Sequence, residues 1–151
     1  MWWKKANFDL LEYQKQHDKG PARSDTNNRP RSNELKCSPP PANTLKANVD
    51  GHCHGDGRWG LGWVVRSVDG VCLGAAKRIV SARSAGEAKA RGIEVVLLSI
   101  HRFEGQSVVI ESDANEVVKA IQTKNFPRVY WGSVVRNCVD LLIALPNVSV
   151  V

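Results

Sequence analysis

The sequence predicts an α/β fold in which an antiparallel hairpin region leads into a parallel sheet. Three stretches of alternating apolar and polar residues follow one another at 45–50, 59–66 and 71–79, with a tight Asp-Gly turn before the third. After residue 83 the apolar period changes from two to about 3.6, and helical segments then alternate with short apolar strands. Helices interleaved with strands are typical of a parallel sheet that helices cover.

The N-terminal quarter of the chain is expected to stand apart from this fold. Residues 2–16 suit either a short helix or a loosely packed, disordered segment. Residues 17–44 hold five of the seven prolines and no Phe, Trp or Tyr, so they bury too little apolar surface to offset their ordering entropy. We therefore predict that residues 1–42 form an N-terminal segment with a proline-rich linker, partly disordered, and that residues 43–151 form one domain.

The first two predicted strands frame a glycine-rich turn. The strand at 45–50 places apolar residues on one face and polar residues on the other, and Asp50 is expected at its end. In the second strand Trp59, Leu61, Trp63 and Val65 share one face. Gly60 and Gly62 alternate with them, which predicts a close approach to the backbone on the opposite face.

The second half of the chain is expected to hold three helices and two strands. The helices are predicted at 84–101, 114–122 and 130–144, and the strands at 106–110 and 148–151. A proline follows each of the last two helices, where its ring and missing amide stop helical hydrogen bonding. The predicted order of elements is therefore β-β-β-α-β-α-α-β.

The composition argues against a membrane or secreted protein and favours a polyanionic partner. No apolar run approaches the ~18 residues of a transmembrane helix, and the N-terminus lacks a signal sequence, so a cytosolic or nuclear location is expected. The formal net charge of +6 favours nucleic acid as the partner. Residues 1–40 carry eight Lys/Arg and five Asp/Glu, and residues 41–151 carry thirteen and ten. A basic groove would thus have to be assembled by folding.

The cysteine pattern predicts neither a zinc site nor disulfides. No two of the four cysteines form a C-x-x-C pair, and their spacings match no common zinc site. Reduced, mostly buried thiols are expected, as suits a reducing compartment. The four residues are Cys37, Cys53, Cys72 and Cys138.

Three carboxylates fall at the ends of predicted elements. Asp50 ends a strand, Glu87 lies in the first turn of a helix, and Asp113 lies where a strand gives way to a helix. In an α/β sheet such junctions gather at one edge, so the three are candidates for a divalent metal site.

Each carboxylate also has a local explanation. An Asp-Gly pair suits a turn, Ser84-x-x-Glu87 is a capping box, and Asp113 is placed to cap the helix that begins at Ala114. A second metal arrangement uses Asp50 with His52 and His54 along one strand face. The surrounding glycines argue against continued strand geometry there.

An ordered set of motifs accompanies these carboxylates. The motifs are KCSPPP at 36–41, LKANVDG at 45–51, WGLGWVVR at 59–66, DG at 69–70, AGEAKA at 85–90 and VVIESDANEVVKAI at 108–121. The stretch from about Pro39 to Val151 resembles the ribonuclease H-like, or reverse-transcriptase-like, domain of plant proteins related to non-LTR retroelements. The resemblance implies a mixed five-stranded sheet, three antiparallel strands followed by parallel ones, with helices packed on it.

The resemblance also implies a chemistry. Asp50, Glu87 and Asp113 would be catalytic carboxylates that bind two Mg²⁺ ions, with Mn²⁺ as an alternative, and cleave the RNA strand of an RNA–DNA hybrid. Two ions about 3.5–4 Å apart activate a water and stabilise the leaving oxygen, and Mg²⁺ prefers hard oxygen ligands. Asp50 would bridge the ions, with Asp113 on the nucleophile side and Glu87 on the other. Recognition would rest on hybrid shape and 2′-hydroxyls.

The chain departs from the family pattern near its C-terminus. The family continues with a further catalytic Asp and a last helix, both of which are expected to be absent from a chain that stops at Val151. Asp140 is expected to be a solvated helix residue and no substitute, and Ser67 stands where the family usually has Asp. Reduced or lost activity is therefore expected. A non-catalytic nucleic-acid-binding module and a truncated retroelement remnant stay open as alternatives.

Overall fold

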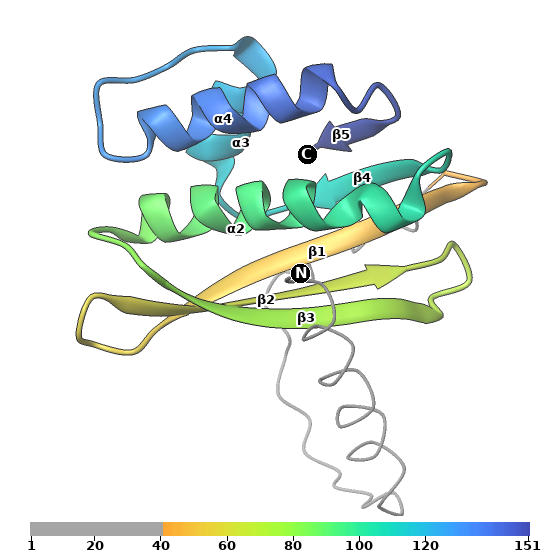
Figure 1. Ribbon diagram of the computed structural model, residues 1–151, viewed down its shortest axis with the longest axis horizontal. Coiled ribbons are helices and arrows are strands. Elements are labelled where there is room, and N and C mark those ends of the chain that lie inside the picture. The colour runs from red at the N-terminus through yellow and green to blue at the C-terminus, as the bar shows by residue number, and fades with distance from the viewer. Residues whose placement is uncertain (1–40) are drawn as a thin grey trace, which may run out of the picture.

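The structure, a computed structural model, describes residues 41–151, which form a mixed sheet with helices packed on it (Figure 1). The strands are β1 (Thr44–Cys53), β2 (Arg58–Arg66), β3 (Cys72–Ser81), β4 (Ser107–Glu111) and β5 (Val148–Val150). The helices are α2 (Ala85–Ser99), α3 (Asn115–Thr123) and α4 (Gly132–Ile143), and a 3₁₀ turn, η1 (Ile100–Phe103), extends α2. The helix or disordered segment predicted at 2–16, the linker up to residue 40, and Cys37 lie outside the described residues.

The sheet has five strands in the order β3-β2-β1-β4-β5. The pairs β1–β2 and β2–β3 are antiparallel, whereas β1–β4 and β4–β5 are parallel. The predicted fold class, a mixed five-stranded sheet with an antiparallel part and a parallel part, is confirmed. β1 and β4 both run toward the end of the molecule at which α2 begins (Figure 1).

The apolar core lies between one face of the sheet and the three helices, which gather on that face (Figure 1). Alternate residues of β1 face the helices, and Leu45, Ala47 and Val49 are all buried there. Gly92 of α2 packs so closely that an added Cβ would lie 3.0 Å from a methyl carbon of Val49. No helix within residues 41–151 is both long and apolar enough to cross a lipid bilayer.

β1 is longer than the sequence predicts, and Asp50 lies inside it. The antiparallel pairing with β2 continues through Asp50–Gly62 to Cys53–Trp59. The parallel pairing with β4 stops earlier, at Asn48–Glu111. The expectation that Asp50 ends the strand is therefore wrong for the β2 side of β1. The chain turns later, where Gly55 and Gly57 take positive φ values that glycine adopts without strain.

The cysteines of the described part are free thiols in three different environments. Cys138 is buried, Cys72 is half-buried and Cys53 is exposed at the end of β1. Burial, together with the nearby Glu94 carboxylate, raises the pKa of Cys138 to about 12. The expectation of mostly buried thiols thus fails for Cys53, because β1 continues past the core into the exposed hairpin.

Candidate functional site

The elements that carry the three candidate carboxylates meet at one end of the sheet. Asp50 lies in β1 just beyond its last pair with β4, so the β4 side of the strand is open there. Asp113 follows the end of β4 by two residues, and Glu87 lies in the first turn of α2. Asp50 and Val49 are neighbours in the strand, so Asp50 projects from the sheet face opposite to α2.

Asp50 has an open environment. Its side chain is exposed and accepts one hydrogen bond, from the amide of Gly51 at 2.7 Å. Its cross-strand partner is Gly62, and an added Cβ on Gly62 would meet no atom within 4 Å. The carboxylate is therefore free to take a ligand from solvent. His52 lies two residues further on the same face, with its ring edge-on to that of His54 at 5.8 Å between centroids.

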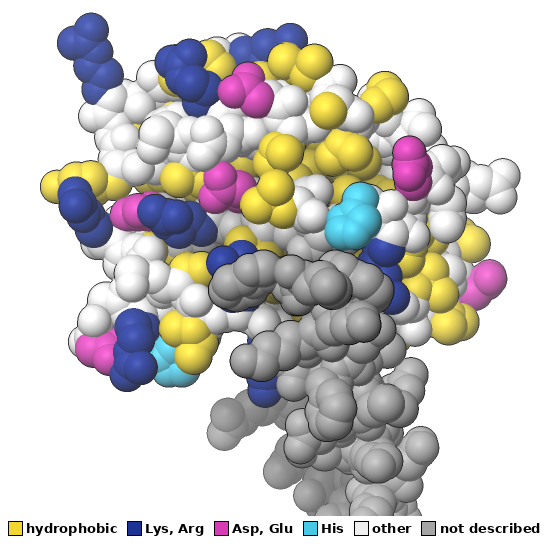
Figure 2. Space-filling model, viewed as in Figure 1, with side chains coloured by type: hydrophobic (Ala, Val, Ile, Leu, Met, Phe, Trp, Pro, Cys, Tyr) yellow, Lys and Arg dark blue, Asp and Glu magenta, His cyan; other side chains and the backbone are white. Residues whose placement is uncertain are grey.

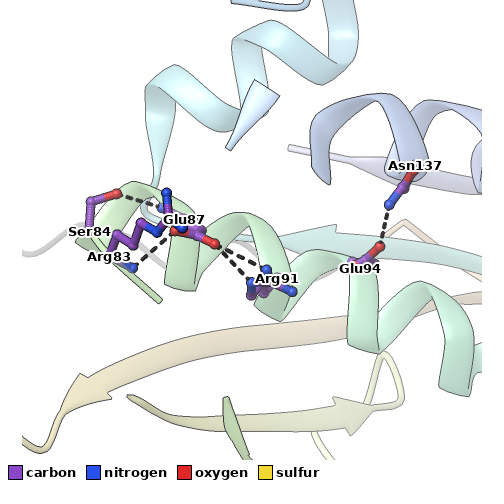
Figure 3. Close-up of polar contacts among 6 residues, drawn as sticks. All are labelled: Arg83, Ser84, Glu87, Arg91, Glu94 and Asn137. Carbon is purple, nitrogen blue, oxygen red and sulfur yellow. Dashed lines mark hydrogen bonds and ion pairs between the residues drawn. The ribbon is translucent and has the colours of Figure 1, made fainter. Parts of the chain in front are cut away.

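Glu87 is buried, and both of its oxygens are engaged (Figure 3). Oε2 accepts a hydrogen bond from the amide of Arg83 at 3.0 Å. Oε1 accepts two hydrogen bonds from the guanidinium of Arg91, one from Nε at 3.2 Å and one from Nη2 at 3.1 Å. The amide of Glu87 donates to Oγ of Ser84 at 3.1 Å. The predicted capping box is thus present in modified form, because Glu87 reaches back one residue further than the cap itself.

These contacts set the charge of Glu87. Burial on its own raises the pKa of this carboxyl, but the Arg83 amide and the Arg91 guanidinium, with its charge, together outweigh burial. The net result is a pKa below the ordinary value, so Glu87 is an anion at neutral pH. Arg91 lies four residues after Glu87, the spacing at which helical side chains meet.

Asp113 pairs with a lysine and does not cap a helix. Its Oδ2 accepts a hydrogen bond from Nζ of Lys89 of α2 at 2.6 Å, in a salt bridge between residues 24 apart in sequence. Residue 114 is the N-cap of α3, and no side chain caps its amides there. The Oγ of Ser112 instead accepts from the amide of Ala114 at 3.3 Å. The capping role expected of Asp113 is therefore wrong, because its carboxylate pairs with Lys89 of α2.

The three carboxylates have the right donor chemistry for a divalent cation but are not assembled into a ligand group. Carboxylate oxygens are the ligands Mg²⁺ prefers. Within residues 41–151, however, no three His, Cys, Asp or Glu side chains lie close enough together to hold a metal ion, and this includes the arrangement of Asp50 with His52 and His54. Glu87 is held by Arg91 and Asp113 by Lys89, whereas no cation among residues 41–151 pairs with Asp50. An ion bound by all three carboxylates would therefore have positively charged neighbours at two of them.

Sequence reasoning missed the two cations of this site. Lys89 and Arg91 both lie in α2, two and four residues after Glu87. The i,i+4 spacing of Glu87 and Arg91 is visible in the sequence and is a usable signal. The contact between Lys89 and Asp113 leaves no such signal, since it depends on how α2 lies beside the end of β4.

Aromatic and basic side chains border the start of α2. The guanidinium of Arg83 lies over the ring of Tyr130, 4.9 Å from its centroid, and Tyr130 is exposed. The indole of Trp131 packs so tightly against Gly86 that an added Cβ would lie 2.8 Å from its nitrogen. Across the face seen in Figure 2, Lys and Arg side chains alternate with Asp and Glu and form no continuous basic patch.

A comparison with protein families agrees with this topology. The family model described as reverse transcriptase-like matches residues 48–151. The chain belongs to the reverse transcriptase-like family. The match spans β1 from Asn48 onward and every later element, and so includes all three carboxylates. No curated protein matches the chain.

Solved structures share the fold of this reverse transcriptase-like chain. Ribonuclease H1 of the archaeon Halobacterium salinarum is 18% identical with a TM-score of 0.63, over 72% of this chain and 83% of its own. LC11 ribonuclease H1, isolated from compost by a metagenomic approach and solved with an RNA/DNA hybrid, is 16% identical with a TM-score of 0.63, over 71% and 83%. A foamy viral protease-reverse transcriptase, also in complex with an RNA/DNA hybrid, is 14% identical with a TM-score of 0.57, over 88% and 20%. The described residues thus have the fold of these ribonuclease H domains.

Proposed function

We propose that this domain binds RNA–DNA hybrids and hydrolyses the RNA strand with divalent ions held by Asp50, Glu87 and Asp113. The observation that carries the proposal is the position of these carboxylates: a central strand, the first turn of the helix packed on it, and the end of the neighbouring parallel strand. The solved hybrid complexes of the LC11 ribonuclease H1 and the foamy viral enzyme support the choice of ligand.

The residues around Asp50 suit an approaching nucleic-acid backbone. Gly62 pairs with Asp50 on the same sheet face, and an added Cβ there would meet no atom within 4 Å, so a sugar–phosphate strand can come close to the sheet at this point. Gly60 is covered by the ring of His54, which would lie 3.0 Å from an added Cβ. Lys77 pairs with Gly62 from β3 and is exposed on that face, where its charge suits a phosphate. This side of the sheet therefore offers a carboxylate flanked by open backbone and a cation.

Each carboxylate would contribute differently to the reaction. Bound Mg²⁺ or Mn²⁺ would supply an activated water and would stabilise the leaving oxygen. Asp50, open to solvent, is the ligand that needs no rearrangement. Glu87 is held in one orientation by Arg91 and the Arg83 amide, and Asp113 would bind the ion in competition with Lys89, which contacts its Oδ2.

The internal ion pairs favour a second candidate function, a hybrid-binding module without catalysis. Two of the three carboxylates are already neutralised by cations of the chain itself. If those pairs persist when nucleic acid binds, the domain recognises the hybrid by shape and phosphate contacts but does not cleave it.

Hybrid cleavage and hybrid binding separate the two functions. A labelled RNA–DNA hybrid is incubated with the 151-residue chain and Mg²⁺, and binding is measured separately in EDTA. The proposed nuclease cleaves, Asp50→Asn abolishes cleavage, and Asp140→Asn, which removes the same charge from an exposed site in α4, leaves cleavage unchanged. Salt-sensitive binding without cleavage identifies the binding module. If the chain neither cleaves nor binds the hybrid, both proposed functions are refuted.

Origin and location are also proposals. The relation to plant non-LTR retroelements rests on the motif resemblance in residues 36–121. A cytosolic or nuclear location rests on the free thiols of the described residues.

A further inference from the structure

We propose that Lys89 is a built-in counter-ion that competes with the divalent cation for Asp113 and so sets the metal affinity of this carboxylate site. The inference rests on the assignment of Asp50, Glu87 and Asp113 as metal ligands under the proposed function. It adds a residue, Lys89, that the carboxylate assignment does not include.

The geometry places the positive charge of Lys89 against one of the candidate ligands. Its ammonium lies 2.6 Å from Oδ2 of Asp113. The Lys89 side chain is only 23% exposed although Asp113 is 66% exposed, so the lysine stem lies against the protein and does not move freely in water. The ammonium takes one lone-pair direction of Oδ2 and places a positive charge beside the carboxylate, which weakens its attraction for a metal ion.

The second cation of the site is held more firmly. Arg91 makes two hydrogen bonds to Oε1 of Glu87, and the Arg83 amide holds Oε2 at the same time. Lys89 makes a single contact to a solvent-exposed oxygen. Lys89 is therefore the cation that yields first when an ion enters, and Arg91 stays in place.

The formal charges show why this matters for binding. The three carboxylates carry three negative charges, and the two cations paired with them carry two positive ones, which leaves one net negative charge. Oxygen sites for hard divalent ions are tuned by the number of charged ligands. With Lys89 in place the net charge of these five side chains is −1. Removing the charge of Lys89 makes it −2, which favours a divalent cation.

Binding of Mn²⁺ alone, without nucleic acid, tests the inference. Binding to the 151-residue chain is measured by electron paramagnetic resonance and titration calorimetry for the parent and for Lys89→Gln. Since exposed ion pairs contribute modestly, we expect Lys89→Gln to bind Mn²⁺ about fivefold more tightly. Asp113→Asn in the Lys89→Gln background should remove that gain.

Two charge controls keep the result specific. Lys89→Arg retains the positive charge and should give no gain in affinity. Lys119→Gln removes the same charge from an exposed position of α3, where bulk screening predicts a change below about twofold. Thermal unfolding without metal checks that each variant is folded.

The outcomes separate the inference from the proposed function. Equal Mn²⁺ affinity in parent and Lys89→Gln, an equal gain in Lys119→Gln, or no Mn²⁺ binding to any variant overturns the role of Lys89. Hybrid binding in EDTA needs no metal, so its loss bears on the nucleic-acid proposal alone. If the chain binds the hybrid but Lys89→Gln binds Mn²⁺ no more tightly than the parent, the nucleic-acid proposal stands and the counter-ion role of Lys89 is refuted.

Discussion

Replacing Glu87 by Gln is expected to destabilise the domain, whereas Asp50→Asn is expected to leave its stability almost unchanged. A carboxylate that serves only to bind metal is uncompensated in the free protein, and removing it costs nothing or stabilises the fold. Glu87 does not have that character, because it is buried and accepts three hydrogen bonds. Asp50 is exposed and accepts one.

The magnitude follows from those contacts. Hydrogen bonds to a charged group contribute about 1.5–3 kcal/mol, and Gln keeps part of them while turning an NH₂ group toward the donors of Arg83 and Arg91. We expect Glu87→Gln to lower the free energy of unfolding by about 2 kcal/mol. With a urea m-value of about 1.5 kcal/mol per M for a domain of this size, the midpoint falls by about 1.3 M. Asp50→Asn should stay within about 0.5 kcal/mol of the parent.

The difference should depend on pH. The folded-state pKa of Glu87 lies below its ordinary value of 4.5, although burial by itself acts in the opposite direction. A group with a lowered folded-state pKa stabilises the fold above its unfolded pKa and loses that contribution as pH falls through the folded value. The difference in unfolding free energy between the parent and Glu87→Gln should therefore be largest at pH 7 and should decrease progressively below about pH 4.5.

Urea titrations followed by tryptophan fluorescence measure all three proteins, since Trp59, Trp63 and Trp131 are half-buried in the folded domain. The measurement is made without metal, so that ligand loss does not contribute. Equal midpoints for Glu87→Gln and the parent at pH 7, or a gap that widens on acidification, would refute the reasoning. A large loss in Asp50→Asn would show that Asp50 has a structural role that its exposure conceals.

Two further predictions concern packing and thiol reactivity. Gly132→Ala should destabilise the domain by about 3 kcal/mol or more, since the new Cβ would lie 2.0 Å from the carbonyl oxygen of Pro127. Gly62→Ala, whose new Cβ meets no atom within 4 Å, should leave the stability unchanged or raise it by up to about 1 kcal/mol, because Ala loses less backbone entropy than Gly in a strand. Similar melting temperatures for the two variants would contradict this. In the native protein iodoacetamide should modify Cys53 and leave Cys138 unmodified at pH 8, because Cys138 is buried and its pKa is raised to about 12. Peptide mass mapping measures the labelling of each cysteine. Equal labelling of Cys53 and Cys138 would contradict the burial of Cys138.

Much of the fold follows from local patterns in the sequence. The turn before β3 is one example, since Asp69-Gly70 predicts a tight turn and Gly70 takes a positive φ of 78° there. The Ser84 cap of α2 is another, because a hydroxyl three residues before Glu87 needs only its own backbone neighbours. Elements of this kind are predictable because the partners lie within a few residues of one another.

The candidate site was predictable only in part. The motif order identifies Asp50, Glu87 and Asp113 as the residues to examine, but it does not show what each side chain contacts. The sequence predicts that Asp113 caps a helix. In the structure its carboxylate instead pairs with Lys89, which lies 24 residues earlier. A local capping contact and a distant ion pair compete for one carboxylate, and the outcome depends on how α2 packs beside β4.

The sequence by itself determined the type and order of the elements, because periods of two and 3.6 residues are local properties of the chain. It also determined where the carboxylates fall along those elements. Only the tertiary structure decided that Asp50 lies inside β1 with its β4 side open, and that Lys89 and Arg91 neutralise its two companions. Those features depend on strand register and helix placement, which arise from contacts between residues far apart in sequence.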